Sequence, residues 1–429
     1  MASILLAACP FRGHVTPTLE LAAGLVGAGH RVRVITGRRY ADEVASAGAE
    51  LRPLPDAADF VEDEIMARFP KRAGLDGVAA ARFDMTHIFL DPVSAQLATV
   101  DAALAEEAVD VIVAEPLFLA ALALVARASA PPVLTLGTMP FLGRQQALPP
   151  IGPPWRVLGP LARGAHDLAG RLVELIMFGP VQRHARQVFA RLGEPRPVTH
   201  FLDWPRAGAG IIQLSVPSFD PIDGLPVPVH HVGTLQGVRT PTAGPPVWWE
   251  RVEEAVAAGT PIVHVTQGTV ANSDLDQLVR PTIRALADRP VLVVATTGGR
   301  DTEPLAHDLP DNAVVDRWID YARLLPVTSV MVTNGGYGGV HEALRHGVPL
   351  VLAGAQQDKA AIGTRLRLSG AGEAVTTLTP DEQTLDRLIG EVLHAETYRR
   401  EARRIRDELA AAPGLAGAVA LVEEQLGAT

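Results

Sequence analysis

Residues Val330 to Gly354 read VMVTNGGYGGVHEALRHGVPLVLAG, and this stretch decides the fold class. An apolar run of strand length leads into a glycine-rich turn, a helical segment and a second apolar run, which is the order of a parallel α/β unit. Four glycines around Tyr337 let backbone amides approach a ligand closely, and the positive end of the helix dipole favours a phosphate. The alternative is a structural turn of the kind that any doubly wound sheet needs.

The same alternation of strands and helices occurs in two parts of the chain. In the first part we expect strands at 3–9, 30–36, 110–116 and 131–138, a loop at 10–14, and helices at 15–29 and 117–130. In the second part we expect strands at 261–268, 291–298, 313–319, 330–334 and 349–354, helices at 274–288 and 339–347, and one long charged helix at about 380–425. This alternation predicts an α/β protein with two Rossmann-like, doubly wound parallel sheets.

The length of 429 residues favours two domains, and a Pro- and Gly-rich tract at 215–246 is the best boundary between them. We therefore expect one domain at 1–214, a linker at 215–246 and a second domain from 247. A cleft between two such domains is the natural place for a ligand. The block at 141–197 has the pattern of amphipathic helices, which either wall that cleft or pack as plain or surface-associated helices.

Composition excludes several classes of protein. The balance of 38 basic and 48 acidic residues gives a net charge of −10 without a dense basic run, so we do not expect a nucleic-acid partner. No segment reaches about 18 uninterrupted apolar residues, which predicts no membrane span. The opening MASILLAACPFRGH has no basic region before its apolar run, which fits a strand better than a signal peptide. The single cysteine, Cys9, excludes an intrachain disulfide and a Cys-based zinc site, and we expect a cytoplasmic protein, a monomer or a homodimer.

Three stretches of the chain resemble family 1 glycosyltransferases of the GT-B fold, a family that includes actinobacterial natural-product enzymes. The longest stretch, RWIDYARLLPVTSVMVTNGGYGGVHEALRHGVPLVLAGAQQDKAAIGTRL, resembles the family's donor-binding signature. PIVHVTQGT resembles the start of the second domain, and CPFRGHVTPTLELAAGL resembles the first loop and helix. The resemblance implies an acceptor domain followed by a nucleotide-sugar domain at 247–405, with a C-terminal helix at 406–429 that returns to the first domain.

The resemblance also implies donor-binding roles for individual residues. Trp318 falls where the family stacks a tryptophan on the nucleotide base, with a core position as the alternative. Glu342, which we expect in the first turn of the following helix, falls where a carboxylate binds the ribose hydroxyls, and a favourable acid near a helix start is its alternative. Asp358 falls where an acid binds the sugar. The complete expected donor set is Thr269, Trp318, Ile319, Asn334, Gly335, Gly336, Tyr337, Gly338, Gly339, Val340, Glu342, Asp358 and Lys359.

The chain departs from the family's commoner pattern at several of these positions. Asn334 replaces a histidine before the glycines, and its amide can donate to a phosphate without carrying a charge. Lys359 follows Asp358 where a glutamine is common, and Tyr337 stands where a small residue is more frequent. These changes leave open the choice between a UDP- and a dTDP-sugar, and Asn334 and Tyr337 are where we expect an altered donor pocket.

The implied reaction is an inverting displacement in which His14 takes a proton from the acceptor hydroxyl. His14 follows the first strand at the carboxyl edge of the sheet, and its titration near neutral pH suits a general base. Glu115 matches the acid that orients this histidine, with Asp84 and Asp110 as the fallback partners. The reaction requires neither a metal nor another cofactor. Asp274 and Asp276 form an acidic pair that we interpret as helix-start residues.

The aromatic segment 60–89 and the apolar block 141–197 suggest a bulky, mostly hydrophobic acceptor such as a polyketide or macrolide aglycone. We expect Phe11, Phe89, Met139 and Phe141 to contact it. Two other functions keep the same fold, namely a nucleotide-sugar epimerase and a non-catalytic nucleotide-sugar-binding partner protein. A Rossmann dehydrogenase fits least, because the first strand-to-helix loop has only Gly13 and cannot make the dinucleotide turn.

Overall fold

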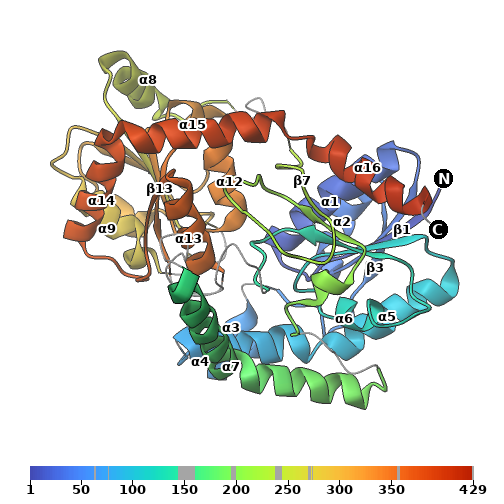
Figure 1. Cartoon of the computed structure of the whole chain (residues 1–429). Helices are drawn as coiled ribbons and strands as arrows, with labels where there is room; N and C mark the ends of the chain where they lie inside the picture. Colours follow the sequence, from blue (N-terminus) through green and yellow to red (C-terminus); the bar gives the residue numbers. More distant parts are fainter. Residues whose placement is uncertain are drawn as a thin grey trace. The chain divides into compact units, whose positions relative to one another are not determined.

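The computed structural model describes residues 1–61, 64–75, 77–143, 160–194, 200–236, 244–268, 272, 274–354 and 358–427, with the side chains of 160–174 left outside the description. The chain forms two compact units (Figure 1). Unit 1 holds Met1–Pro217, Pro221–Gln236 and Ala412–Thr429, and unit 2 holds Ser218–Asp220 and Gly237–Ala411.

Unit 1 is built on a seven-stranded sheet in which every neighbouring pair of strands is parallel. The strand order is β3-β2-β1-β4-β5-β6-β7. The strands are β1 (Ser3–Ala7), β2 (Arg31–Thr36), β3 (Glu50–Pro53), β4 (Val111–Ala114), β5 (Val133–Gly137), β6 (Gly210–Gln213) and β7 (Val229–His231). The edge strand β7 lies inside the tract that its proline content had suggested as a linker.

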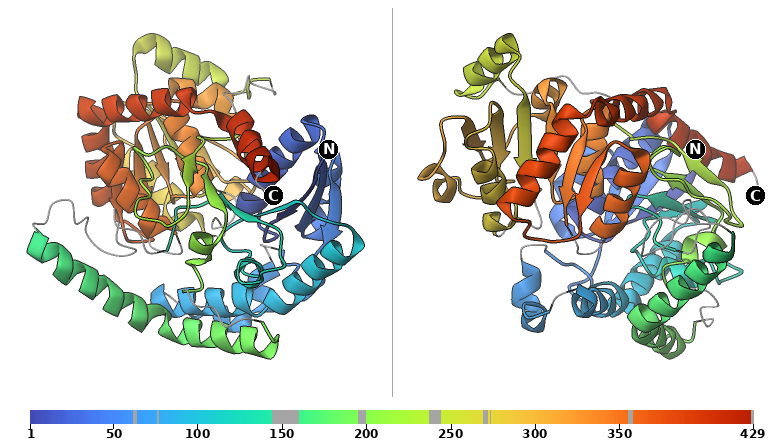
Figure 2. Two further views of the ribbon diagram at one scale, coloured as in Figure 1. Left: turned by 45° about the vertical axis from the view of Figure 1, so that its right-hand side comes forward. Right: turned by 60° about the vertical axis from the view of Figure 1, so that its left-hand side comes forward.

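Side chains of the central strands alternate between two hydrophobic clusters, as a sheet buried on both faces requires. Leu5 and Ala7 of β1 belong to one cluster, while Ile4 and Leu6 belong to the other. Helices therefore lie on both faces of the sheet (Figure 2). The helices of unit 1 are α1 (Arg12–Gly27), α2 (Ala41–Ser46), α3 (Ile65–Arg68), α4 (Gly77–Phe83), the π-helix η4 (Asp84–Leu90), α5 (Val93–Glu106), α6 (Ala121–Leu124), α7 (Pro160–Arg191) and α16 (Gly414–Gly427), with 3₁₀ turns η1 (Arg38–Tyr40), η3 (Pro70–Arg72) and η6 (Trp204–Ala207).

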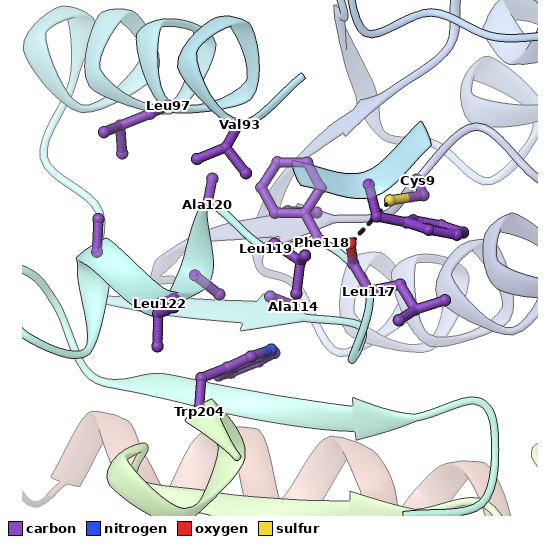
Figure 3. Packing of buried hydrophobic residues seen from close by; sticks show 14 of the residues in the cluster. Cys9, Val93, Leu97, Ala114, Leu117, Phe118, Leu119, Ala120, Leu122 and Trp204 are labelled. Atoms are coloured by element: carbon purple, nitrogen blue, oxygen red, sulfur yellow. Dashed lines mark hydrogen bonds between the residues drawn. The ribbon is translucent and has the colours of Figure 1, made fainter. Parts of the chain in front are cut away.

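The larger cluster of unit 1 gathers side chains from α5, from the segment after β4 and from η6 (Figure 3). Its largest fully buried member is Trp204, whose indole N–H donates to the carbonyl of Pro116 at 2.9 Å. Cys9 lies in the same cluster, and its thiol donates to the carbonyl of Leu117 at 3.2 Å. These bonds satisfy polar groups beside the carboxyl end of β4, which is where Glu115 follows the strand.

Unit 2 repeats the plan with six parallel strands in the order β10-β9-β8-β11-β12-β13. The strands are β8 (Ile262–Thr266), β9 (Leu292–Thr296), β10 (Ala313–Asp316), β11 (Val330–Thr333), β12 (Leu350–Ala353) and β13 (Gly372–Val375). The helices are α8 (Trp249–Ala258), α9 (Val279–Ala285), α10 (Glu303–Ala306), α11 (Tyr321–Leu324), α12 (Tyr337–Arg345), α13 (Lys359–Ser369), α14 (Glu382–His394) and α15 (Glu396–Ala411), with 3₁₀ turns η7 (Leu275–Gln277) and η8 (Leu325–Val327).

The two doubly wound parallel sheets confirm the fold class predicted from the sequence, but four predicted helices differ in extent. The helix predicted at 274–288 is the 3₁₀ turn η7 followed by the shorter helix α9. Helix α1 begins at Arg12, so Pro17 lies inside the helix rather than in its first turn. The predicted helix at 117–130 shortens to α6, because this stretch is largely buried and forms successive turns rather than a one-sided helix. The predicted long C-terminal helix is three helices, interrupted by the extended backbone of Ala395 and by Pro413, which has no N–H to donate.

One helical run in the described part of the chain, Gly77–Glu106, is long and apolar enough to pass a length and composition test for a membrane span. Half of its most apolar window is buried within the structure, which is also the behaviour of a core helix. Leu97 and Val100 of this run belong to the main hydrophobic cluster of unit 1. The run is therefore weak support for a span.

Helix α7 contains Pro180, whose nitrogen carries no hydrogen, so the carbonyl of Ile176 loses its intrahelical donor. Arg82 of α4 supplies the missing donors. Its guanidinium donates to the carbonyl of Ile176 and, at 2.6 Å, to that of Met177. A proline that would weaken an isolated helix thus becomes the point at which α7 is joined to α4.

This contact predicts a coupling between Arg82 and Pro180. Replacing Arg82 by Ala should lower the free energy of unfolding by about 1–3 kcal/mol, because charged donors to two carbonyls are lost. In a Pro180→Ala background the loss should be smaller, since the new backbone N–H can donate to Ile176 within the helix. Urea unfolding of the two single variants and the double variant measures the coupling, and an equal loss in both backgrounds would contradict this role of Arg82.

Candidate active site

Both sheets reverse their strand order at one point, and the predicted site residues follow the strands at these two points. In unit 1 the reversal lies between β1 and β4, and in unit 2 it lies between β8 and β11. Ligands of open α/β sheets bind beyond the carboxyl ends of the strands at such points. His14 and Glu115 follow β1 and β4, and Asn334 follows β11.

Glu115 is fully buried and receives three hydrogen bonds at the carboxyl edge of the unit 1 sheet. The backbone N–H of Cys9 donates to its Oε1 at 3.1 Å, and the N–H of Leu117 donates to its Oε2 at 2.8 Å. His14 Nδ1 lies 2.8 Å from the same Oε2. His14 stands in the first turn of α1, not in the loop expected from the sequence, and its side chain keeps 18% of its surface exposed.

Burial by itself raises the pKa of the Glu115 carboxyl, but the charge of His14 and the hydrogen bonds from His14, Leu117 and Cys9 outweigh it, so the pKa is lowered overall. An ionised Glu115 is an acceptor only, which requires that Nδ1 of His14 carries the hydrogen. The neutral imidazole then presents a basic Nε2. The arrangement can accept a proton at Nε2 and stabilise the resulting imidazolium.

The two fallback partners of His14 are engaged elsewhere, so these alternatives are wrong for this structure. Asp84 forms a bidentate pair with Arg72, at 2.6 Å to Nε and 3.2 Å to Nη2. Asp110 accepts from the N–H of Ser3 at 2.8 Å, at the amino end of the sheet. Thr138, which was not predicted from the sequence, follows β5 and places its Oγ1 3.4 Å from His14 Nδ1.

The expected acceptor residues divide between two hydrophobic clusters. The ring of Phe11 lies 6.2 Å from the His14 ring and 5.8 Å from the ring of Phe89, which is carried by the π-helix η4. Phe89 and Met139 are buried in the cluster against which Phe11 packs. Phe141 belongs instead to a separate cluster with Ile211 and Ile222. The structure therefore brings Phe11, Phe89 and His14 together and leaves Phe141 apart from them.

In unit 2 the glycine-rich stretch is partly helix rather than a loop of four glycines. Helix α12 begins at Tyr337 after the cap residue Gly336, so Gly338 and Gly339 lie in its first turn. Gly335 needs to be glycine, because its φ is +87° and a Cβ there would come within 2.6 Å of Leu352. At the other three glycines a Cβ would meet no described atom within 4 Å, so the packing of the described residues does not require glycine there.

Three side chains around this turn have partners within unit 2. The amide of Asn334 donates to the carbonyl of Gln267, which ties the ends of β11 and β8 together. Tyr337 is buried and its hydroxyl donates to Asp220 at 3.0 Å. Glu342 lies in the second turn of α12 rather than the first, and it pairs with Arg345 at 3.2 Å.

Trp318 is 60% exposed, which excludes the alternative that it is a core residue. One side of its ring lies over Gly299, where a Cβ would come within 2.8 Å of the indole. Gly299 has a φ of +94°, and the neighbouring Gly298 is held close to the carbonyl of Gly268. The turn after β9 therefore supports the tryptophan. This turn was not predicted from the sequence, although the pair of glycines at the end of a predicted strand was a visible signal.

The remaining predicted donor residues are Ile319, Val340, Asp358, Lys359 and Thr269, and they lie on different elements or outside the described part. Asp358 precedes α13 as its cap residue. Lys359 is buried beside Gly354, and desolvation lowers the pKa of its ammonium while Asp358 opposes that shift. Ile319 is half-buried against α8 and β10, and Val340 is fully buried. Thr269 lies outside the described residues.

Metal-ligand geometry is not found among the described residues, where no group of three or more His, Cys, Asp or Glu side chains could hold an ion. The acidic pair Asp274 and Asp276 starts a 3₁₀ turn, in which the Asp274 carboxylate accepts from the N–H of Asp276 at 3.0 Å. This confirms the helix-start interpretation of that pair.

Comparisons with known proteins found similar sequences and a similar fold. The family model described as "Erythromycin biosynthesis protein CIII-like, C-terminal domain" matches residues 282–424. The chain is 36% identical to 4'-demethylrebeccamycin synthase of Lentzea aerocolonigenes, over 98% of this chain and 99% of that protein. It is 30% identical to UDP-glucosyltransferase B1 of Starmerella bombicola, over 95% and 94% of the two chains. The crystal structure of the glycotransferase of kitacinnamycin superposes with a TM-score of 0.75 at 22% identity, covering 99% of each chain, which confirms the predicted GT-B fold.

The lowered pKa of Glu115 predicts how the stability of unit 1 depends on pH. Because the folded pKa lies below the ordinary value of 4.5, ionised Glu115 stabilises the folded state above that value. This contribution is lost as the pH falls from about 4.5 through the folded pKa. We expect Glu115→Gln to be less stable than the unaltered protein at pH 7, by about 1–3 kcal/mol.

Urea unfolding followed by circular dichroism between about pH 7 and about pH 3.5 tests this prediction. The difference between the unaltered protein and Glu115→Gln should shrink as the solution is acidified. The control is Glu423→Gln, which removes a half-exposed glutamate that also pairs with a histidine, His30. A difference that stays constant across the acid range would contradict the lowered pKa.

Proposed function

The chain belongs to the nucleotide-sugar-dependent glycosyltransferases of family 1 with the GT-B fold, and from that premise we propose that it transfers a sugar, with inversion, from a UDP- or dTDP-sugar to a hydroxyl of a bulky hydrophobic natural product. His14 is the general base of this reaction. The observation that carries the proposal is the buried, ionised Glu115, which engages Nδ1 of His14 and leaves Nε2 as the basic nitrogen. We further propose that the protein acts in the cytoplasm.

Proton removal is the contribution of unit 1. The acceptor hydroxyl donates to Nε2 of His14, and the proton moves to that nitrogen as the oxygen attacks the anomeric carbon. The positive charge that forms on the imidazole is stabilised by Glu115, whose two other donors are backbone amides and so keep it ionised and fixed. The oxygen–carbon bond forms on the face opposite the departing diphosphate, and this produces inversion.

Stabilisation of the departing nucleoside diphosphate is the contribution of unit 2. The first N–H groups of a helix have no partner within the helix and point along its positive dipole end. In α12 these groups belong to Tyr337, Gly338 and Gly339. Glycine is unfavourable in a helix by about 1 kcal/mol relative to alanine, and packing of the described residues does not require it at Gly338 or Gly339. Close approach of a phosphate to the backbone explains why glycine is used there.

Side chains from several elements of unit 2 recognise the base and the sugar. Trp318 offers an exposed aromatic face for stacking on the pyrimidine. Glu342 can accept from the ribose hydroxyls, while Arg345 of the same helix pairs with its carboxylate at 3.2 Å. Asp358 and Lys359 at the start of α13 contact the sugar. Thr269 contacts the phosphates.

The acceptor is proposed to lie against Phe11, Phe89 and Met139. Phe11 is the half-buried member of a pair of phenylalanine rings beside His14, and buried Phe89 supports it from the π-helix η4. π-helical turns are frequent at functional sites. An aromatic wall beside the base suits a flat or macrocyclic aglycone, which is the class of small molecule that the family's natural-product members glycosylate.

Replacing His14 by Ala should reduce sugar transfer by about 10²- to 10⁴-fold, the usual contribution of a general base. The affinity for UDP and dTDP should change by less than about twofold, because the diphosphate contacts belong to unit 2. Transfer to a panel of polyketide and aromatic aglycones, followed by mass spectrometry, measures the first quantity, and calorimetry measures the second.

The matched control is His30→Ala, which removes a second histidine that pairs with a glutamate in unit 1, before β2 and away from the carboxyl edge. Its transfer rate should remain normal. Retention of the full transfer rate by His14→Ala would refute the assignment of His14 as the base.

A further prediction concerns Trp318. Trp318→Ala should weaken UDP or dTDP binding by about 5- to 100-fold, because one base stacked on an aromatic ring contributes about 1–3 kcal/mol. Trp318→Phe keeps an aromatic face and should recover most of the affinity. Equal affinities for all three proteins in calorimetry would rule out stacking on this residue.

A further inference from the structure

We propose that Asp220 is a positioning residue for the donor site, which fixes the first turns of α12 and α13 relative to each other through one buried carboxylate. The inference rests on the proposed function, because it concerns the helices that would hold the diphosphate and the sugar. Asp220 belongs to a three-residue segment, Ser218–Asp220, that is part of unit 2 although the residues on either side belong to unit 1.

The carboxylate of Asp220 is completely buried and bonds to two helices at once. Its Oδ2 accepts from the hydroxyl of Tyr337 at 3.0 Å, and its Oδ1 accepts from Nε of Arg365. Tyr337 is the first residue of α12, and Arg365 lies in the second turn of α13. The two partners are 117 and 145 positions from Asp220 in the sequence. The carboxylate is therefore a tertiary bridge between two elements.

On α12, the hydrogen bond to Asp220 comes from Tyr337, the first residue of the helix and of the proposed anion site. The N–H of Tyr337 is one of the proposed phosphate donors, so the position of its side chain also sets the position of that N–H. The ring of Tyr337 lies 4.2 Å from that of His341, which in turn makes an edge contact of 5.0 Å with Phe219. His341 donates from Nδ1 to the carbonyl of Tyr337 at 2.9 Å. Asp220 thus holds Tyr337 through its hydroxyl, and Phe219 contacts the ring of His341, which bonds to the carbonyl of Tyr337.

On α13, the bond to Asp220 comes from Arg365, which lies further along the helix than the residues proposed to contact the sugar. Arg365 also donates to the carbonyl of Ala361 at 3.3 Å, which ties its guanidinium to the first turn of the same helix. Asp358 and Lys359 directly precede and begin that turn. A rotation of α13 about its axis would move these residues and Arg365 together. The pair with Asp220 therefore opposes displacement of the residues proposed to contact the sugar.

A buried ion pair is poor support for stability by itself, because desolvation of both charges offsets their attraction. Its geometry, however, is specific, since a carboxylate that accepts from a tyrosine and an arginine permits little movement of either. Shifts of about 1 Å at groups that bind the reacting atoms can reduce rates by two orders of magnitude. Placement of two binding turns is thus a better explanation of this buried carboxylate than stability alone.

The experiment compares Tyr337→Phe, Asp220→Asn and the double variant with the unaltered protein. Calorimetry gives the dissociation constants for UDP and dTDP, initial rates give kcat and KM for the donor and the acceptor, and thermal unfolding gives Tm. The control is Tyr398→Phe, which removes another tyrosine hydroxyl that bonds to carboxylates in unit 2, those of Glu373 and Glu391 on β13 and α14.

We expect Tyr337→Phe to raise the dissociation constant and the donor KM by about three- to tenfold, the effect of one lost hydrogen bond, with the acceptor KM unchanged and Tm equal to that of Tyr398→Phe. Tyr398→Phe should bind the diphosphate normally. The double variant should lose little more affinity than Asp220→Asn alone, because both changes remove the same bond.

Three outcomes would overturn the inference. Normal diphosphate affinity in Tyr337→Phe would show that the bond does not position the site. Equal loss of affinity in Tyr337→Phe and Tyr398→Phe would assign the effect to general destabilisation of unit 2. If the unaltered protein binds neither UDP nor dTDP, the proposed function and this inference both fall, whereas binding by the unaltered protein with no change in Tyr337→Phe rejects this inference alone.

Discussion

A buried carboxylate cannot remain ionised without donors, and Glu115 obtains them only because β1 and β4 are neighbours in the unit 1 sheet. The N–H of Cys9 comes from the end of β1 and that of Leu117 from the turn after β4. Any change in the pairing of these strands would remove at least one of the two amides. The ionised carboxylate in turn fixes the His14 imidazole, so the sheet topology leads directly to the orientation of the proposed base.

In unit 2, N–H donors are proposed to stabilise a negative charge in the same way. This charge belongs to the bound diphosphate rather than to a side chain. A helix that begins directly after a central strand of a parallel sheet offers free N–H groups at the carboxyl edge, where a diphosphate can replace the missing acceptors. Gly335 makes the turn from β11 into α12 possible, since its φ of +87° is unfavourable for other residues. Asp220 then holds the first residue of that helix through its side chain. In both units a carboxylate inside the protein places the group that is proposed to do the chemistry.

Local sequence patterns predicted a large part of this arrangement. Apolar runs and helical periodicity predicted the two parallel sheets. His14, Glu115 and Asn334 come at or just after the ends of predicted strands, which places them at the carboxyl edges. The pairing of His14 with Glu115 came from a resemblance, and the structure brings the two side chains to 2.8 Å. Tyr337 shows what such patterns do not reveal, because its hydroxyl donates to Asp220, which lies 117 positions away. Nothing local to Tyr337 encodes that distant partner.

Other failures have the same origin. The mostly apolar stretch 117–130 has no polar face that could reveal its turns. Phe141, which follows β5, packs with Ile211 of the neighbouring strand β6 and with Ile222. Residues whose environment is set by strand order were predictable, whereas residues whose environment is set by a distant segment were not.

The central claim is that buried Glu115 keeps the hydrogen of neutral His14 on Nδ1, so that Nε2 is the nitrogen that accepts a proton. Nitrogen-15 NMR of protein with labelled histidine, at a pH where His14 is neutral, tests it most directly, with His14→Gln to assign the signals. We expect an Nδ1 resonance of a protonated nitrogen and an Nε2 resonance of an unprotonated one, and this preference should weaken in Glu115→Gln. A His14 ring that carries its hydrogen on Nε2 in the unaltered protein would contradict the account.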